Sequence, residues 1–165
     1  MFELKPLSKE AVPAALEKAH RYRLLNEPME AESICRDVLD VDPGNEEATV
    51  TLLLALSDQF DERPTCFEQT REILSRIQDD YTRTYYDGLV CERKAKAHFR
   101  RGGPRAGHDA YEWFRQAMEH YEKAETLRPA GNDDAILRWN ACVRILTNHA
   151  ELTPEPEEVF RPWLE

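Results

Sequence analysis

Long apolar runs are missing from this sequence, since the longest uninterrupted one reaches only from Leu52 to Leu56. A helix that crosses a bilayer needs about 20 apolar residues, and the opening MFELKPLSKE contains no apolar stretch of signal-peptide length. The formal net charge is −10 and the isoelectric point about 5.1. An acidic chain of this kind is repelled by nucleic acid and by anionic membranes, so we expect a cytoplasmic protein that binds neither.

Paired cysteines are missing as well. The chain has no C-x-x-C pair, and its four cysteines are widely separated: Cys35, Cys66, Cys91 and Cys142. We expect them to be small, buried and reduced apolar residues, as is usual for scattered cysteines in a cytoplasmic protein. Because the cysteines are scattered in this way, we predict neither a cofactor nor a metal. The alternative is a zinc site that the fold would assemble with His98 or His120.

Signatures of catalysis are also missing. The sequence contains no nucleophile-elbow, phosphate-loop, dinucleotide-binding or zinc-protease motif, and its five histidines are dispersed. Adjacent acids such as Asp133 and Asp134 stand at an expected helix start, where negative charge offsets the helix dipole. Because this explains them better than an acid/base pair does, we expect a protein that is not an enzyme.

Helical periodicity is what the chain has in abundance. Strand signals are nearly absent, whereas apolar residues recur every 3.6 residues over most of the length. The stripes predict an all-α domain over 1–149, with seven helices as antiparallel neighbours joined by short loops. They run through 15–25, 31–39, 48–56, 67–77, 80–101, 111–124 and 132–146. Gly88, alone inside the fifth segment, indicates a close helix crossing.

Two turns of nearly the same sequence separate these helices, DVDPGNEEA at 40–48 and LRPAGNDDA at 127–135. Each one ends an apolar pattern with a proline, turns through glycine and asparagine, and starts the next helix with two acids. Asn45 and Asn132 are the expected N-caps, and the acids that follow favour the positive end of the helix dipole. Such recurring punctuation predicts stacked helical hairpins.

Residues 12–45 resemble one repeat of the tetratricopeptide family, whose pattern is W-x2-L-G-x2-Y, then A-x3-F, then P. In this chain the pattern becomes Ala15-x2-Lys18-Ala19-x2-Tyr22, Ala31-x3-Cys35 and Pro43. Ala117-x3-Tyr121 and Pro129 match its second half at the same spacing. The resemblance implies a right-handed α-solenoid of three to four antiparallel helical hairpins. It also implies a non-catalytic module that binds a peptide or partner surface in a concave groove.

In that family the first helices of successive hairpins line the groove. The resemblance therefore implies that the following residues face it: Leu16, His20, Arg23, Val50, Leu54, Arg93, Lys96, Arg100, Asn140 and Arg144. Some family members clamp a C-terminal carboxylate with Lys and Asn in their first repeat. Leu16 and His20 stand at the matching positions here, so such a clamp is not indicated.

One basic segment departs from the acidic whole. RKAKAHFRRGGPR, residues 93–105, holds six of the 22 basic residues and no acid. Arg93, Lys96 and Arg100 in it fall on one helical face. The segment is either a helix C-terminus whose cations offset the dipole or a patch for an acidic partner segment.

The last residues, 150–165, form a tail rich in proline and glutamate that cannot continue a helix. Its apolar residues Phe160, Trp163 and Leu164 are expected to cover the last helix, to bind another protein, or to enter the chain's own groove. We therefore predict an adaptor or scaffold that binds a protein or peptide, with an acidic segment as one candidate. A small acidic cytoplasmic chaperone for a secreted or membrane-destined client is the alternative. No feature indicates the oligomeric state.

Overall fold

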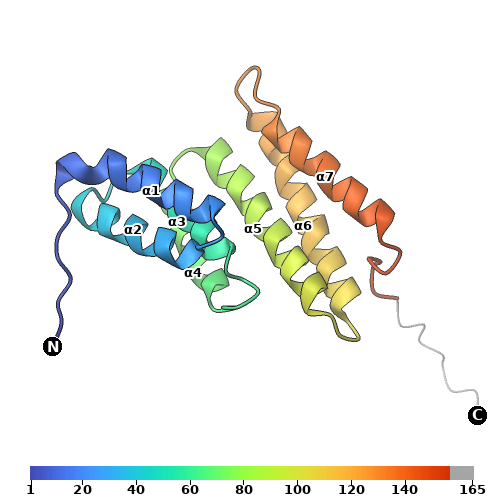
Figure 1. The fold of residues 1–165 in the computed structure, drawn as a ribbon. Helices are drawn as coiled ribbons and strands as arrows, with labels where there is room; N and C mark the ends of the chain where they lie inside the picture. Colours follow the sequence, from blue (N-terminus) through green and yellow to red (C-terminus); the bar gives the residue numbers. More distant parts are fainter. Residues whose placement is uncertain (157–165) are drawn as a thin grey trace, which may run out of the picture.

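The computed structural model describes residues 1–156, which form seven α-helices, one short 3₁₀ helix and no strand (Figure 1). The elements are η1 (Lys9–Ala11), α1 (Val12–Leu24), α2 (Pro28–Val41), α3 (Glu46–Ser57), α4 (Cys66–Leu74), α5 (Asp80–Arg101), α6 (Ala106–Leu127) and α7 (Asp134–Asn148). The all-helical prediction is confirmed. None of these described helices has the length and apolar character needed to cross a bilayer.

Side chains at the turns explain where several helices begin and end. The Ala48 amide donates a 2.8 Å hydrogen bond to the Asn45 side chain, as the first of the two similar turns predicts. In the second turn the Asp134 amide donates to Asn132 at 3.0 Å. The prediction that Asn132 is the N-cap is wrong, because Asp133 occupies that position and α7 begins at Asp134. Gly102, with φ 72°, ends α5.

Consecutive helices pack against each other, and the odd-numbered helices also contact one another in order, α1 with α3, α3 with α5, and α5 with α7. In Figure 1, α1–α4 lie together on one side and α6 and α7 on the other, with α5 between them. Residues far apart in the sequence are therefore brought to one side of the molecule by the odd-numbered helices.

The apolar core has two main parts that share α5. Leu52, Leu53 and Leu56 fill the part between α1 and α5, and Phe114 and Tyr121 fill the part between α5 and α7. Burying such a large side chain contributes roughly 1.5–3 kcal/mol. Helix α5 contributes buried residues to both parts, so contacts with α1–α4 and with α6 and α7 together fix its position.

Gly88 marks a close helix crossing, as its place in the sequence predicts. A Cβ at this position would lie 2.8 Å from Cε1 of Tyr121 on α6 and 3.2 Å from the Ala117 carbonyl oxygen. Real Cβ atoms essentially never approach a neighbour to 2.8 Å. Glycine therefore sets how closely α5 and α6 approach each other.

The described start of the C-terminal tail packs back on α6. Leu152 is buried in the core part formed by α5–α7, and His108 Nδ1 lies 2.8 Å from the Thr153 carbonyl oxygen. A Cβ on Gly107 would come within 2.2 Å of the Glu151 carbonyl oxygen, so this glycine leaves room for the tail. The tail residues for which the sequence predicts a cap lie outside the described residues: Phe160, Trp163 and Leu164.

Candidate functional site

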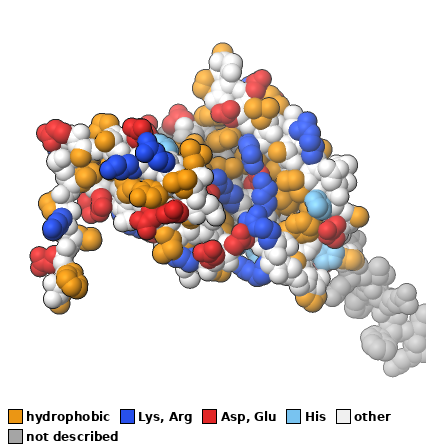
Figure 2. Space-filling view, viewed as in Figure 1, with side chains coloured by type: hydrophobic (Ala, Val, Ile, Leu, Met, Phe, Trp, Pro, Cys, Tyr) orange, Lys and Arg blue, Asp and Glu red, His pale blue; other side chains and the backbone are white. Residues whose placement is uncertain are grey.

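Two adjoining depressions lie on the side of the molecule formed by the odd-numbered helices. One, of about 410 Å³, is lined by His20, Arg23, Leu24, Asn26 and Asp58. The other, of about 280 Å³, is lined by Ser57, Asp58, Leu89, Arg93, Lys96, Arg100 and Arg138. They share Asp58, and we call them together the odd-helix groove. In Figure 2 a column of Lys and Arg side chains runs over the middle of the molecule, where α5 lies in Figure 1.

Asp58, just after α3, joins three helices at the centre of the groove. The Arg23 guanidinium of α1 donates to it at 2.8 Å, and Arg93 of α5 donates to its other oxygen. Arg93 also donates to the Leu54 carbonyl oxygen at 2.9 Å and to the Ser57 hydroxyl at 2.6 Å. Burial lowers the pKa of Arg93, while Asp58 acts to raise it. Arg93 is thus held by its own chain and forms a wall of the groove.

A buried carboxylate lies beneath the next part of the groove. The Glu92 side chain is wholly buried and receives hydrogen bonds from Lys96 at 2.5 Å and from the Tyr121 hydroxyl at 2.7 Å. Arg138 of α7 donates to it with two nitrogens. Burial alone would raise the pKa of Glu92, but the bonds from Lys96, Arg138 and Tyr121 together hold it below its usual value. We call these four residues the Glu92 cluster; it joins α5, α6 and α7.

Arg100 is the least restrained cation of the groove. Its guanidinium contacts Asp61 at 2.6 Å, and the side chains are 58% and 43% exposed. An exposed ion pair of this kind contributes only about 0–1 kcal/mol. Arg100 can therefore exchange Asp61 for another carboxylate at little cost, whereas Arg93 and Arg138 cannot leave their buried partners.

Half of the ten residues that the sequence places in a groove come together, and all five are basic residues or histidine. His20, Arg23, Arg93, Lys96 and Arg100 all line the odd-helix groove. His20 is exposed, and its Nε2 lies 2.9 Å from a carboxylate oxygen of Glu47.

The apolar residues predicted for the groove lie elsewhere. Leu16 is only 3% exposed, because it packs in the core against Val38 of α2 and Ala48 of α3, so it has no surface to offer a partner. Leu54 is half-buried against the core and meets the groove through its carbonyl oxygen. Val50 lines a different cavity, between the end of α2 and the start of α5. The lining of the groove is therefore mainly polar and charged, with Leu24 and Leu89 as its apolar members.

The last helix contributes a different residue to the groove from the two that the family pattern implies. Asn140 and Arg144 are exposed on α7 but line neither depression, whereas Arg138 lines one. Glu92, Asp58 and Arg138 were not predicted. The sequence carries no local signal for them, since each acquires its role only through contact with a helix distant in the chain.

All four cysteines are buried and free, as predicted. Burial raises the pKa of Cys35, Cys91 and Cys142 to about 12 and raises that of Cys66 as well. Burial therefore favours the thiol over the reactive thiolate at each of these positions as long as no metal ion is bound.

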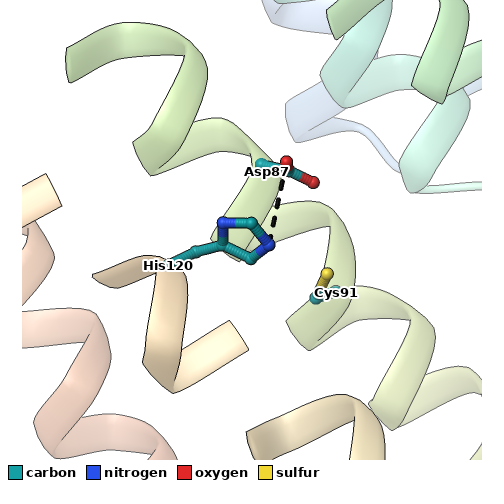
Figure 3. A group of neighbouring side chains, drawn as sticks. All are labelled: Asp87, Cys91 and His120. Atoms are coloured by element: carbon teal, nitrogen blue, oxygen red, sulfur yellow. Dashed lines mark ion pairs between the residues drawn. The ribbon is translucent and has the colours of Figure 1, made fainter. Parts of the chain in front are cut away.

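Three side chains of metal-ligating type converge on the face of α5 that meets α6. Asp87 and Cys91 stand one turn apart on α5, and His120 reaches them from α6 (Figure 3). Their ligand atoms all lie within 4.8 Å of one another, and His120 Nε2 is 3.7 Å from Asp87 Oδ2. The sequence contains the Asp87-x3-Cys91 spacing, but only the pairing of α5 with α6 reveals the third member.

Comparisons with protein-family models, with curated proteins and with solved structures found no match to this chain. The function proposed below therefore rests on the residues and their geometry.

Proposed function

We propose that the protein is a non-catalytic adaptor or scaffold whose odd-helix groove binds an acidic segment of a partner protein. One observation carries this proposal. Basic residues from α1, α5 and α7 gather on one side of a chain whose net charge is −10: Arg23, Arg93, Lys96, Arg100 and Arg138. A local excess of cations on an acidic protein selects acidic partners, because the rest of the surface gives them no attraction.

These cations differ in how firmly the chain itself holds them. Arg93 and Arg138 are bound to buried acceptors and give the groove its shape. Lys96 is one-third exposed above Glu92, and Arg100 is more exposed still. A partner carboxylate would meet Arg100 first, since a guanidinium can donate two parallel hydrogen bonds to one carboxylate.

The proposal includes the right-handed solenoid of tetratricopeptide-like hairpins that the sequence suggests. The order of contacts among α1, α3, α5 and α7 supports it, because stacked hairpins place their first helices side by side. A cytoplasmic location is part of the same proposal.

The chaperone alternative needs a broad apolar surface for unfolded clients. The structure has an apolar cavity of about 470 Å³, with walls that include Leu39, Val50, Ile73 and Ile77. Charged and polar residues, Arg76 and Asp79 among them, also line it. These polar side chains interrupt the apolar wall, so the cavity does not form a broad apolar surface. The polar odd-helix groove therefore favours the adaptor.

Selection from a displayed library of random peptides tests the proposal without a known partner. Arg100→Glu reverses the charge of the exposed cation in the groove. Lys123→Glu reverses the charge of an exposed residue on α6 that lies outside the groove. Lys96 is left in place, because a carboxylate there would stand beside buried Glu92.

We expect the unchanged protein and Lys123→Glu to enrich peptides rich in Asp and Glu, and Arg100→Glu to lose that enrichment. Enrichment of the same acidic peptides by Arg100→Glu would place their binding outside the groove. Enrichment of apolar peptides by all three proteins would favour the chaperone.

A further inference from the structure

A second site lies apart from the odd-helix groove, where α5 crosses α6. We propose that Asp87, Cys91 and His120 bind a zinc ion that links these two helices. The inference does not depend on the adaptor function, because none of the three residues lines the groove.

The spacing of the three ligand atoms suits a small metal ion. Zinc binds sulfur at about 2.3 Å and nitrogen or oxygen at about 2.0–2.2 Å, so ligands of one tetrahedral ion lie roughly 3.2–3.7 Å apart. The observed separations are at most 4.8 Å, and that between His120 Nε2 and Asp87 Oδ2 is already 3.7 Å. The ligand atoms therefore need to approach one another by only about 1 Å to meet a single ion.

The backbone brings the ligands this close because the crossing itself is close. Gly88 and Tyr121, whose contact sets the helix separation, are the sequence neighbours of Asp87 and His120. Asp87 and Cys91 are four residues apart on a regular helix, so both side chains point to the same side. In Figure 3 the His120 ring lies between α6 and these two side chains.

The hydrogen bonding of Asp87 supports a cation at this place. Its Oδ1 atom is buried and has no hydrogen-bond partner among residues 1–156. Buried polar atoms are almost always paired, and a metal ion between the three side chains would supply the missing partner. His120 Nε2 is too far from Asp87 to form a hydrogen bond itself.

The donor set selects the metal. A cysteine sulfur and an imidazole nitrogen favour zinc over magnesium or calcium, which prefer sites built of oxygen alone. The side chains of Asp87 and His120 are 26% and 33% exposed, so an ion can enter from solvent. Cys91 releases its thiol proton to solvent when the metal binds. Three protein ligands leave one tetrahedral position for water.

Cobalt(II) titration of the full-length protein tests the proposal, because a thiolate bound to cobalt gives a charge-transfer absorption in the near ultraviolet. The variants are Cys91→Ser, Asp87→Asn and His120→Gln, with Cys142→Ser as the matched control. Cys142 is equally buried. Circular dichroism verifies that each variant folds. His120 is partly exposed, so His120→Gln can still test the site if a variant at a buried position does not fold.

We expect one cobalt ion per chain, displaced by zinc. The charge-transfer band should persist in Cys142→Ser and vanish in Cys91→Ser, and the affinity should fall at least tenfold in Asp87→Asn and His120→Gln. Equal affinity in folded His120→Gln and in the unchanged protein would overturn the proposal. So would the absence of a band in the unchanged protein, or a band that only Cys142→Ser removes.

Discussion

Replacement of Glu92 by glutamine would remove one negative charge from the centre of the molecule with almost no change of shape. The amide can still accept the hydrogen bond of Tyr121, but it no longer pairs with the Lys96 ammonium and the Arg138 guanidinium. Both cations then lose the charge that holds them against α5. Glu92→Gln therefore isolates the ionic part of the Glu92 cluster.

The expected cost follows from the burial of each partner. A hydrogen bond to a charged group contributes about 1.5–3 kcal/mol, and Glu92 accepts such bonds from two cations. Lys96 and Arg138 are 33% and 32% exposed, so water recovers part of that loss. We expect Glu92→Gln to lower the free energy of unfolding by about 2–4 kcal/mol. That is a large share of the roughly 5–15 kcal/mol typical of a domain.

Urea unfolding followed by circular dichroism measures this difference. Glu72→Gln is the matched control, because Glu72 pairs with Arg76 on the surface, where both side chains are more than half exposed. The control should change the free energy of unfolding by less than about 0.5 kcal/mol. If Glu92→Gln costs no more than Glu72→Gln, the Glu92 cluster does not hold α5, α6 and α7 together as described.

The same carboxylate predicts a dependence on pH. The pKa of Glu92 in the folded protein lies below its usual value of 4.5, so folding favours the ionised form. Its contribution is complete above about pH 4.5 and is lost as the pH falls through the lower pKa of the folded state. The advantage of the unchanged protein over Glu92→Gln should therefore shrink on acidification below pH 4.5. An advantage that grows in that range would contradict the direction of the shift.

Three further changes test the packing by the same unfolding measurement. Gly88→Ala should cost about 1–3 kcal/mol, since its methyl group would overlap Tyr121; a gain in stability would contradict the close crossing. Leu152→Ala should cost about 2–4 kcal/mol if the tail fills the core as described, and a cost near zero would place Leu152 outside it. Asn45→Ala should cost about 1 kcal/mol through loss of the α3 cap, and an unchanged value would show that the cap is dispensable.

The helices could be predicted because their information is local. Apolar residues at 3.6-residue spacing locate the segments, and side chains such as Asn45 determine their starts within a few residues. Gly88 could be interpreted in the same way, since a lone glycine in a long helix has few uses other than a close contact. These features need no knowledge of what lies opposite each helix.

The site was only partly predictable because its chemistry depends on partners distant in the chain. The spacing of Arg93, Lys96 and Arg100 places them on one helical face, and all three line one depression beside α5. Nothing in the sequence distinguishes Glu92 from the other acids, since its burial depends on Tyr121 and Arg138 in later helices.

The burial of Leu16 could not be predicted from the sequence either. The family pattern gives its position along the repeat, but contact with α2 and α3 decides that it is buried.

Fluorescence anisotropy of a labelled oligoglutamate peptide measures whether the odd-helix groove binds acidic segments. A chain with a net charge of −10 repels this probe everywhere except at a local excess of cations. We expect binding by the unchanged protein and by Lys123→Glu, at least tenfold weaker binding by Arg100→Glu, and weaker binding of the peptide as salt is added. Equal binding by Arg100→Glu and Lys123→Glu, or no binding by the unchanged protein at low salt, would contradict the proposed function.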